Sequence, residues 1–248
     1  MELRDAIIII TGAGRGIGRA IAKSLAAEGA HVYICSRTKT ELEETAREIR
    51  ESGGRCSWRV ADVARSCEID AFVSAVMREH GRLDAVIGNA GSTAPAGNLE
   101  TVSDSDYKLT MSSNVDGLFF LVRAAVPIMR QQNRGWIVAV SSGAGLRGHS
   151  RLSVYSAAKF AIQGMMQALA SEVEDTQIRV VSINPGAVNT RLLADLFGFE
   201  EASKHQPPEA VAAALIQILT EEHSVPNGGG VCIRGGSITE TYSRTPAR

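Results

Sequence analysis

Short apolar segments alternate with longer amphipathic segments along most of the chain. Seven short segments are mostly apolar along their length, which predicts strands buried on both faces of a sheet. They are residues 6–10, 32–35, 57–60, 85–87, 136–140, 180–183 and 231–233. Apolar residues recur at helical spacing over residues 17–28, 40–51, 68–80, 114–131, 153–174 and 209–219. This alternation predicts an α/β fold, a single doubly wound Rossmann-type domain with a mostly parallel seven-stranded sheet flanked by helices.

Local signals refine this picture at three places. Thr40 and Glu43 have the spacing of a capping box, and Pro207-Pro208 precede the last predicted helix. Residues 191–206 mix apolar and charged side chains without a clear period. Because they follow the sixth strand, residues 191–207 are interpreted either as a substrate flap or as a plain connecting helix. No internal repeat or linker divides the chain, so residues 1–248 are expected to form one domain.

Composition excludes several classes of protein. The 248 residues carry a net charge of -1, with 44% hydrophobic and 21% charged residues, so we expect no nucleic-acid or membrane partner. No apolar run approaches the roughly 20 residues that cross a bilayer, and a cytoplasmic protein is expected. The four cysteines are widely spaced. They predict reduced, mostly buried thiols, without a disulfide framework or a metal site.

A glycine-rich stretch, "TGAGRGIG" at residues 11–18, lies between the first strand and the first helix. Backbone N-H groups and the helix dipole can hold a pyrophosphate at such a place, which predicts a dinucleotide site. The glycines follow the spacing Gly12-x-x-x-Gly16-x-Gly18, which differs from the common G-x-G-x-x-G pattern.

The end of the second strand indicates which dinucleotide binds. The residues available there are Ser36, Arg37 and Thr38, with no carboxylate before Glu41. An acid would bond a ribose 2'-hydroxyl and repel a 2'-phosphate, whereas a guanidinium pairs with the phosphate. Arg15 can approach the same phosphate from the glycine loop, so the sequence favours NADP(H) over NAD(H). The alternative is that Arg37 is solvated and that Arg15 belongs to the loop without contacting a ligand.

The stretch "YSAAKF" places Tyr155 and Lys159 four positions apart, on one face of a predicted helix. A nearby ammonium is expected to lower the pKa of the phenol, as acid-base catalysis requires. Ser142 lies thirteen residues before Tyr155, at the end of a strand, where its hydroxyl can bond a substrate oxygen. The neighbouring Ser141 is a rival for this role by position.

Together these motifs resemble the short-chain dehydrogenase/reductase family. Further pieces of the family pattern follow in order: Asp62-Val63, Asn89-Ala90-Gly91, Asn114 and Pro185-Gly186. The resemblance implies a catalytic group formed by Asn114, Ser142, Tyr155 and Lys159. With the arguments above, it implies cofactor contacts from Gly12, Arg15, Gly16, Ile17, Gly18, Ser36, Arg37, Thr38, Asp62, Val63, Asn89, Ala90, Gly91, Tyr155, Lys159, Pro185, Gly186, Val188 and Thr190.

The resemblance also implies roles for the catalytic group. Ser142 and Tyr155 hold a carbonyl oxygen, the nicotinamide delivers hydride, and Tyr155 supplies the proton. Lys159 bonds the nicotinamide ribose, and Asn114 helps to hold a water that connects Lys159 to solvent. Asp62 contacts the adenine, although a plain turn role is an alternative.

The expected function is an NADP(H)-dependent oxidoreductase that interconverts a ketone and an alcohol, either a 3-oxoacyl thioester or another small carbonyl. One alternative is an NAD-dependent sugar or steroid alcohol dehydrogenase, and another is a non-catalytic dinucleotide sensor. The loop at residues 143–153 carries Arg147, His149 and Arg151, which either attract an anionic substrate or face solvent. By resemblance the chain forms a homotetramer or homodimer through its two long helices. Two departures from the family are Arg234 and a long, polar tail at 239–248.

Overall fold

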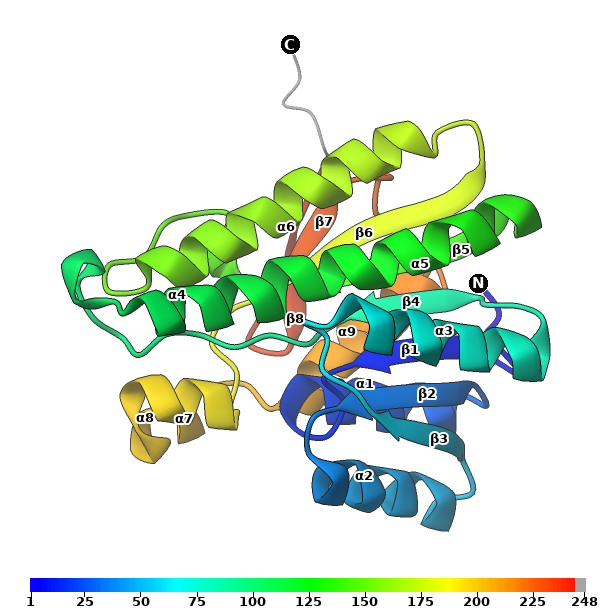
Figure 1. Ribbon diagram of the computed structural model, residues 1–248, viewed down its shortest axis with the longest axis horizontal. Helices are drawn as coiled ribbons and strands as arrows, with labels where there is room; N and C mark the ends of the chain where they lie inside the picture. Colours follow the sequence, from blue (N-terminus) through cyan, green and yellow to red (C-terminus); the bar gives the residue numbers. More distant parts are fainter. Residues whose placement is uncertain (244–248) are drawn as a thin grey trace.

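One sheet of eight strands organises the molecule, in the order β3-β2-β1-β4-β5-β6-β7-β8 (Figure 1). This computed structural model describes residues 1–243. The strands are β1 Ile7–Thr11, β2 His31–Ser36, β3 Arg55–Val60, β4 Ala85–Gly88, β5 Arg134–Val140, β6 Gln177–Pro185, β7 Gly230–Arg234 and β8 Ser237–Tyr242. All neighbouring pairs are parallel except β7 and β8. The predicted fold class is confirmed.

Helices cover both faces of the sheet (Figure 1). They are α1 Gly16–Ala27, α2 Lys39–Glu51, α3 Ser66–His80, α4 Asp104–Met111, α5 Gly117–Gln132, α6 Ser153–Glu172, α7 Arg191–Phe197, α8 Phe199–Ser203 and α9 Pro208–Leu219. Residues from α1, α2 and α9 share one apolar cluster, and residues from α3, α5 and α6 share another. The long helices therefore divide into two layers around the strands.

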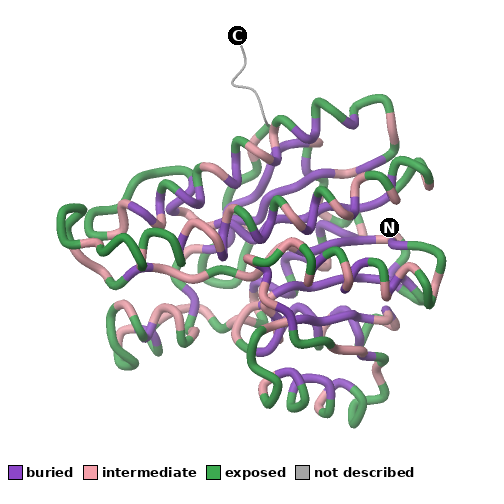
Figure 2. Tube along the Cα trace, in the orientation of Figure 1, coloured by how far each residue is buried: buried purple, intermediate pink, exposed green. Residues whose placement is uncertain are grey.

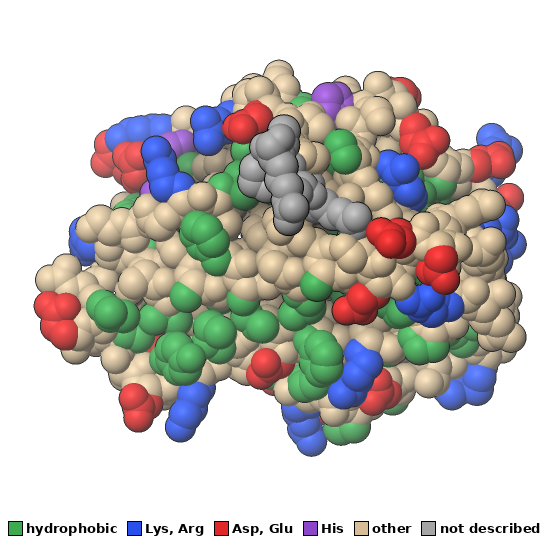
Figure 3. Space-filling view, turned by 90° about the horizontal axis from the view of Figure 1, so that it is seen from above, with side chains coloured by type: hydrophobic (Ala, Val, Ile, Leu, Met, Phe, Trp, Pro, Cys, Tyr) green, Lys and Arg blue, Asp and Glu red, His purple; other side chains and the backbone are tan. Residues whose placement is uncertain are grey.

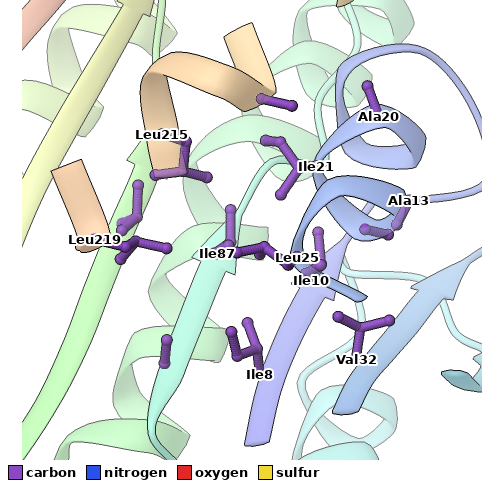
Figure 4. Close-up of a cluster of buried hydrophobic side chains, with 14 of the residues drawn as sticks. Ile8, Ile10, Ala13, Ala20, Ile21, Leu25, Val32, Ile87, Leu215 and Leu219 are labelled. Atoms are coloured by element: carbon purple, nitrogen blue, oxygen red, sulfur yellow. The ribbon is translucent and has the colours of Figure 1, made fainter. Parts of the chain in front are cut away.

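The first strand shows how the sequence produces these two layers. Successive side chains of a strand point to opposite faces. Accordingly, Ile8 and Ile10 belong to the cluster under α1 and α9, while Ile7 and Ile9 belong to the cluster under α3 and α5. Figure 4 shows Ile8 and Ile10 among side chains of α1 and α9, and the purple strands of Figure 2 mark the buried sheet. Burial of each such isoleucine contributes about 1.5–3 kcal/mol.

The eighth strand corrects the expectation of seven. Gly235 and Gly236 have φ values of +56° and +82°, which lets the chain reverse direction after β7. The returning strand lies at the sheet edge and is mostly exposed, so it lacks the apolar run that marks a buried strand. The tail predicted at 239–248 thus begins inside β8, and its residues 244–248 lie outside the described residues.

Three local expectations also change. The predicted capping box is wrong, because α2 begins at Lys39 and Thr40 already lies in its first turn. The helix predicted from residue 114 begins as a π-helical turn, Ser112–Asp116, and is preceded by α4, which the apolar period does not reveal. Residues 191–206 contain two short helices, α7 and α8.

The surface agrees with the balanced composition. In Figure 3, acidic and basic side chains are interspersed with apolar ones on the face shown. None of the described helices is long and apolar enough to cross a bilayer. The four cysteines are free thiols, and only Cys67 among them is exposed. The expectation of mostly buried thiols without disulfides is therefore confirmed.

A buried polar network ties β8 to the rest of the domain. The Tyr242 hydroxyl accepts a hydrogen bond from Asn184 Nδ2 at 2.7 Å and donates one to Gln163 Oε1 at 3.0 Å. Gln163 Nε2 in turn donates to Asn184 Oδ1. Asn184 and Gln163 are 1% and 6% exposed, and Gln163 Oε1 accepts from this phenol, while Asn184 Nδ2 also donates to Val231 O at 3.1 Å.

We therefore expect Tyr242→Phe to lower the free energy of unfolding by about 1–3 kcal/mol, because two buried amides lose a partner. Tyr107→Phe is the matched control, since Tyr107 is 50% exposed. It should change stability by less than about 0.5 kcal/mol. Urea unfolding of both variants measures the difference, and equal midpoints would contradict this role.

Candidate active site

The backbone conformation of the glycine loop requires glycine at two of its positions. Gly12 and Gly16 have φ values of +66° and +56°. A Cβ at Gly12 would lie 2.7 Å from the Cα of Ala90, and one at Gly18 would lie 2.4 Å from Asn89 Nδ2. The loop therefore packs directly against the end of β4, and α1 starts close above the sheet.

Asn89 joins the ends of β1 and β4. Its Nδ2 donates to the carbonyl oxygens of Thr11 and Gly12, both at 3.0 Å. The Thr11 hydroxyl oxygen accepts from the backbone N-H groups of Asn89 and Ala90, both at 3.2 Å. Four hydrogen bonds thus fix the glycine loop at the point where the strand order reverses, the usual ligand position in an open α/β sheet.

A cleft runs along these carboxyl ends of the strands, and most of the predicted residues line it. Those that line it are Gly12, Arg15, Gly16, Ile17, Ser36, Arg37, Thr38, Asp62, Val63, Asn89, Ala90, Gly91, Asn114, Tyr155, Lys159 and Thr190. Those outside its lining are Gly18, Ser142, Pro185, Gly186 and Val188. Val188 is 5% exposed and packs in the core, and the N-H of Gly186 bonds Ile233 O at 2.8 Å.

Sequence reasoning missed several residues of the cleft. They are Gly14, Glu41, Ala61, Ser113 and Val140, while Ser141 was named as a rival serine and Arg191 and Leu192 open the predicted flap. Most are neighbours of predicted residues, so their positions follow from the strand ends. Glu41 is different, because it enters the cleft from the first turn of α2. The missing signal was the start of this helix at Lys39 in place of Thr40, which brings Glu41 into the cleft.

Helix α6 brings Tyr155 and Lys159 to the floor of this cleft. Lys159 is 4% exposed, and its Nζ donates to Val140 O at 3.0 Å and lies 5.6 Å from the centre of the Tyr155 ring. Ser142 follows β5, where its hydroxyl accepts from Ala144 N at 3.1 Å.

The structure separates the two rival serines. Ser141 lines the cleft and Ser142 does not. A place in the lining does not by itself show which hydroxyl acts together with the Tyr155 phenol. Ser141 Oγ donates to the backbone oxygen of Lys159 at 3.3 Å and is 4% exposed. Burial raises the pKa of Tyr155, and the Ser142 hydroxyl acts against this increase. This interaction with the phenol favours Ser142.

The expected lowering of the tyrosine pKa is wrong for this structure. Burial raises the pKa of Tyr155 to about 12, and the Ser142 hydroxyl opposes this only in part. Burial also lowers the pKa of Lys159 to about 8. The ammonium is directed to the Val140 carbonyl, so desolvation outweighs its effect on the phenol. At neutral pH Tyr155 is consequently a neutral phenol that can donate a proton.

Asn114 lies in the π-helical turn, beside the same group. Its Nδ2 donates to Ser92 O at 2.6 Å and Thr110 O at 2.8 Å, while its buried Oδ1 has no partner. A Cβ at Gly91 would lie 2.5 Å from Asn114 Oδ1 and 3.6 Å from Lys159 Nζ. An open acceptor and an ammonium therefore border one small space, which suits a polar ligand.

The site fits a bound dinucleotide. Its glycine loop opens α1 at the strand-order reversal, glycines replace side chains that would fill the cleft, and an unpaired acceptor faces it. Fold and cleft together define an α/β protein of the dinucleotide-binding class.

Comparison with known proteins identifies the family. The sequence model described as short chain dehydrogenase matches residues 6–201, so the chain belongs to the short-chain dehydrogenase/reductase family. It is an oxidoreductase of a family that binds nicotinamide dinucleotides and acts on carbonyl or alcohol groups.

Relatives of known activity cover nearly the whole chain. The chain is 32% identical to an NADPH-dependent pterin aldehyde reductase of Arabidopsis thaliana, over 91% of this chain and 92% of that protein. Levodione reductase has a similar structure, with a TM-score of 0.88 and 29% identity over 94% and 97% of the two chains. A 3-ketoacyl-(acyl-carrier-protein) reductase from Brucella melitensis, complexed with NADH, matches with a TM-score of 0.86 and 29% identity over 94% and 98%.

The buried lysine predicts a pH dependence of stability. The pKa of Lys159 is about 8 in the folded protein and 10.5 ordinarily, so between these values the unfolded chain binds more protons there. The free energy of unfolding should therefore rise with pH across this window. Relative to Lys159→Met, the wild type should gain up to about 3 kcal/mol between pH 8 and 10.5.

Urea titrations at a series of pH values measure this effect. Lys39→Met is the control, because the Lys39 side chain is 66% exposed. Its stability should follow that of the wild type at each pH. Parallel curves for wild type and Lys159→Met would show that the ammonium is not desolvated.

Proposed function

We propose that this protein is an NADP(H)-dependent carbonyl reductase whose catalytic group is Asn114, Ser142, Tyr155 and Lys159. The observation that carries the proposal is the Tyr155 phenol beside a buried Lys159, with both residues lining the cleft along the strand ends. A phenol that keeps its proton at neutral pH suits the reductive direction, in which an alkoxide must be protonated.

The chain's own residues perform the acid-base part of the reaction. The chemistry that a nicotinamide would supply in this cleft is hydride for the carbonyl carbon. Tyr155 donates its proton to the carbonyl oxygen, and the Ser142 hydroxyl stabilises charge that develops there. Lys159 would hold the nicotinamide ribose. Asn114 Oδ1 offers an acceptor that would hold a water, and this water would connect Lys159 to solvent.

Helices α7 and α8 support a role for residues 191–207 as a substrate flap. Thr190 caps α7 by accepting from Leu193 N at 3.3 Å, and Arg191 and Leu192 line the cleft. Beyond them, Phe197 and Phe199 are 45% and 73% exposed. We propose that these rings cover an apolar part of the carbonyl substrate. The compounds to test first are those named for the relatives, namely pterin aldehydes, levodione and 3-ketoacyl thioesters.

Charge at the far end of the cleft supports NADP(H). Arg37 is exposed and has no ion-pair partner among the described residues, and Arg15 lies across from it on the cleft lining. An unpaired guanidinium at the end of β2 suits a 2'-phosphate. The NADPH dependence of the pterin aldehyde reductase relative points in the same direction.

Exposed apolar residues on the long helices support self-association. Phe119 on α5 and Phe160 on α6 are 44% and 46% exposed. We propose that these helices pair between subunits in a homodimer or homotetramer.

A cytoplasmic location is also proposed, since the exposed Cys67 has no disulfide partner.

The proton-donor role predicts that Tyr155→Phe lowers kcat for ketone reduction by about 10²–10⁴-fold, because no phenolic proton remains to donate. NADPH binding should be retained. The panel of carbonyls above, assayed by NADPH oxidation, measures the loss, and Tyr107→Phe serves as the exposed control. Full activity in Tyr155→Phe would remove the basis of the proposal.

The cofactor assignment predicts that Arg37→Asp raises the Kd for NADPH by about 100-fold, since a carboxylate replaces the cation facing the phosphate. The Kd for NADH should change by less than about threefold. Isothermal titration with both cofactors measures the two constants. If NADPH affinity were insensitive to this change, the NAD-dependent alternative would be preferred.

A further inference from the structure

One ion pair lies at the end of the cleft proposed for the 2'-phosphate. Arg15 Nη1 is 3.3 Å from Glu41 Oε1, and the two side chains are 55% and 27% exposed. A Cβ at Gly14 would lie 3.1 Å from Glu41 Oε2 and 2.9 Å from Ser36 Oγ. The Glu41 carboxylate thus lies over the glycine loop and beside the end of β2.

Backbone contacts fix this position. The Thr45 hydroxyl donates to Glu41 O at 2.9 Å and is also 3.1 Å from Gly14 O. Arg19 donates to the same Gly14 oxygen from Nε at 3.0 Å and Nη2 at 2.8 Å. The first turn of α2 is therefore tied to the glycine loop, which places the backbone of Glu41 beside the cleft.

Glu41 differs from the other acids on α2. Arg19 pairs with Glu44 at 2.9 Å, and Lys23 pairs with Glu48 at 2.7 Å. These pairs join α1 to α2 outside the cleft, whereas Glu41 is the acid of this group that lines it among the described residues. Glu44 is therefore a natural control for the charge of Glu41.

Arg15, Arg37 and Glu41 interact differently with the 2'-phosphate of NADP(H) and the 2'-hydroxyl of NAD(H). A 2'-phosphate can pair with Arg37 and can take Arg15 from its exposed, weak ion pair with Glu41. It then leaves an unpaired carboxylate beside the phosphate. A 2'-hydroxyl carries no charge and can instead donate a hydrogen bond to that carboxylate. Glu41 therefore opposes one cofactor and assists the other.

We infer that Glu41 is a cofactor-selectivity residue, which competes with the 2'-phosphate for Arg15 and holds down the preference for NADP(H). This inference rests on the proposed NADP(H) dependence. Glu41→Gln keeps the size of the side chain but removes the charge. We expect it to lower the Kd for NADPH by about tenfold and to leave unchanged or raise the Kd for NADH.

Isothermal titration of the full chain with NADPH and NADH provides the test. Glu44→Gln should leave both constants within about twofold, because Glu44 pairs outside the cleft. A cycle with Arg15→Gln tests the competition itself. Removal of Arg15 should weaken NADPH binding about threefold in the wild type but about tenfold in the Glu41→Gln background, where Arg15 is fully available.

These experiments distinguish a failure of the role inferred for Glu41 from a failure of the proposed NADP(H) dependence. An unchanged or raised Kd for NADPH in Glu41→Gln, or equal effects of Arg15→Gln in both backgrounds, would overturn the role of Glu41. The wild-type constants and Arg37→Asp test the proposed cofactor separately. A wild type that binds NADH more tightly, with NADPH binding insensitive to Arg37→Asp, would instead reject the proposed NADP(H) dependence.

Discussion

The site depends first on the contact between the ends of β1 and β4. At this point the strand order reverses, and the helices that follow the two strands lie on opposite faces of the sheet. Asn89 closes the resulting gap by bonding Thr11 and Gly12 through its side chain and backbone. Because these residues also form the glycine loop, the same bonds stabilise the sheet and position the N-H groups that open α1.

Burial sets the chemistry at the other end of the cleft. It acts on the two titrating groups in opposite directions, raising the pKa of Tyr155 and lowering that of Lys159. The phenol keeps its proton while the ammonium is brought closer to losing one. A lysine held this way can return a proton to the tyrosine after transfer, and the open acceptor of Asn114 lies next to it. Desolvation of Tyr155 and Lys159, more than the attraction between them, explains the shifts of their two pKa values.

Sequence patterns predicted the parts of the molecule that depend on which residues follow one another along the chain. Buried parallel strands are continuously apolar, so β1 and β5 were found, and the polar edge strand β8 was not. Residues immediately after strands, such as Asn89 and Asp62, lie in the predicted cleft because parallel strands end at one edge. The pKa of Tyr155 was predicted in the wrong direction, since a spacing of four residues does not show how deeply a pair is buried.

Glu41 shows why cofactor preference is harder to predict than cofactor binding. Along the sequence, Arg37 comes first after β2 and the acid is four residues further on, which suggests that the acid is irrelevant. In the fold, α2 begins at Lys39 and turns back toward the glycine loop, so four residues bring the carboxylate to Gly14 and Arg15. In the selectivity that we infer, two arginines are balanced against one acid, and the start of α2 decides how close that acid lies to them.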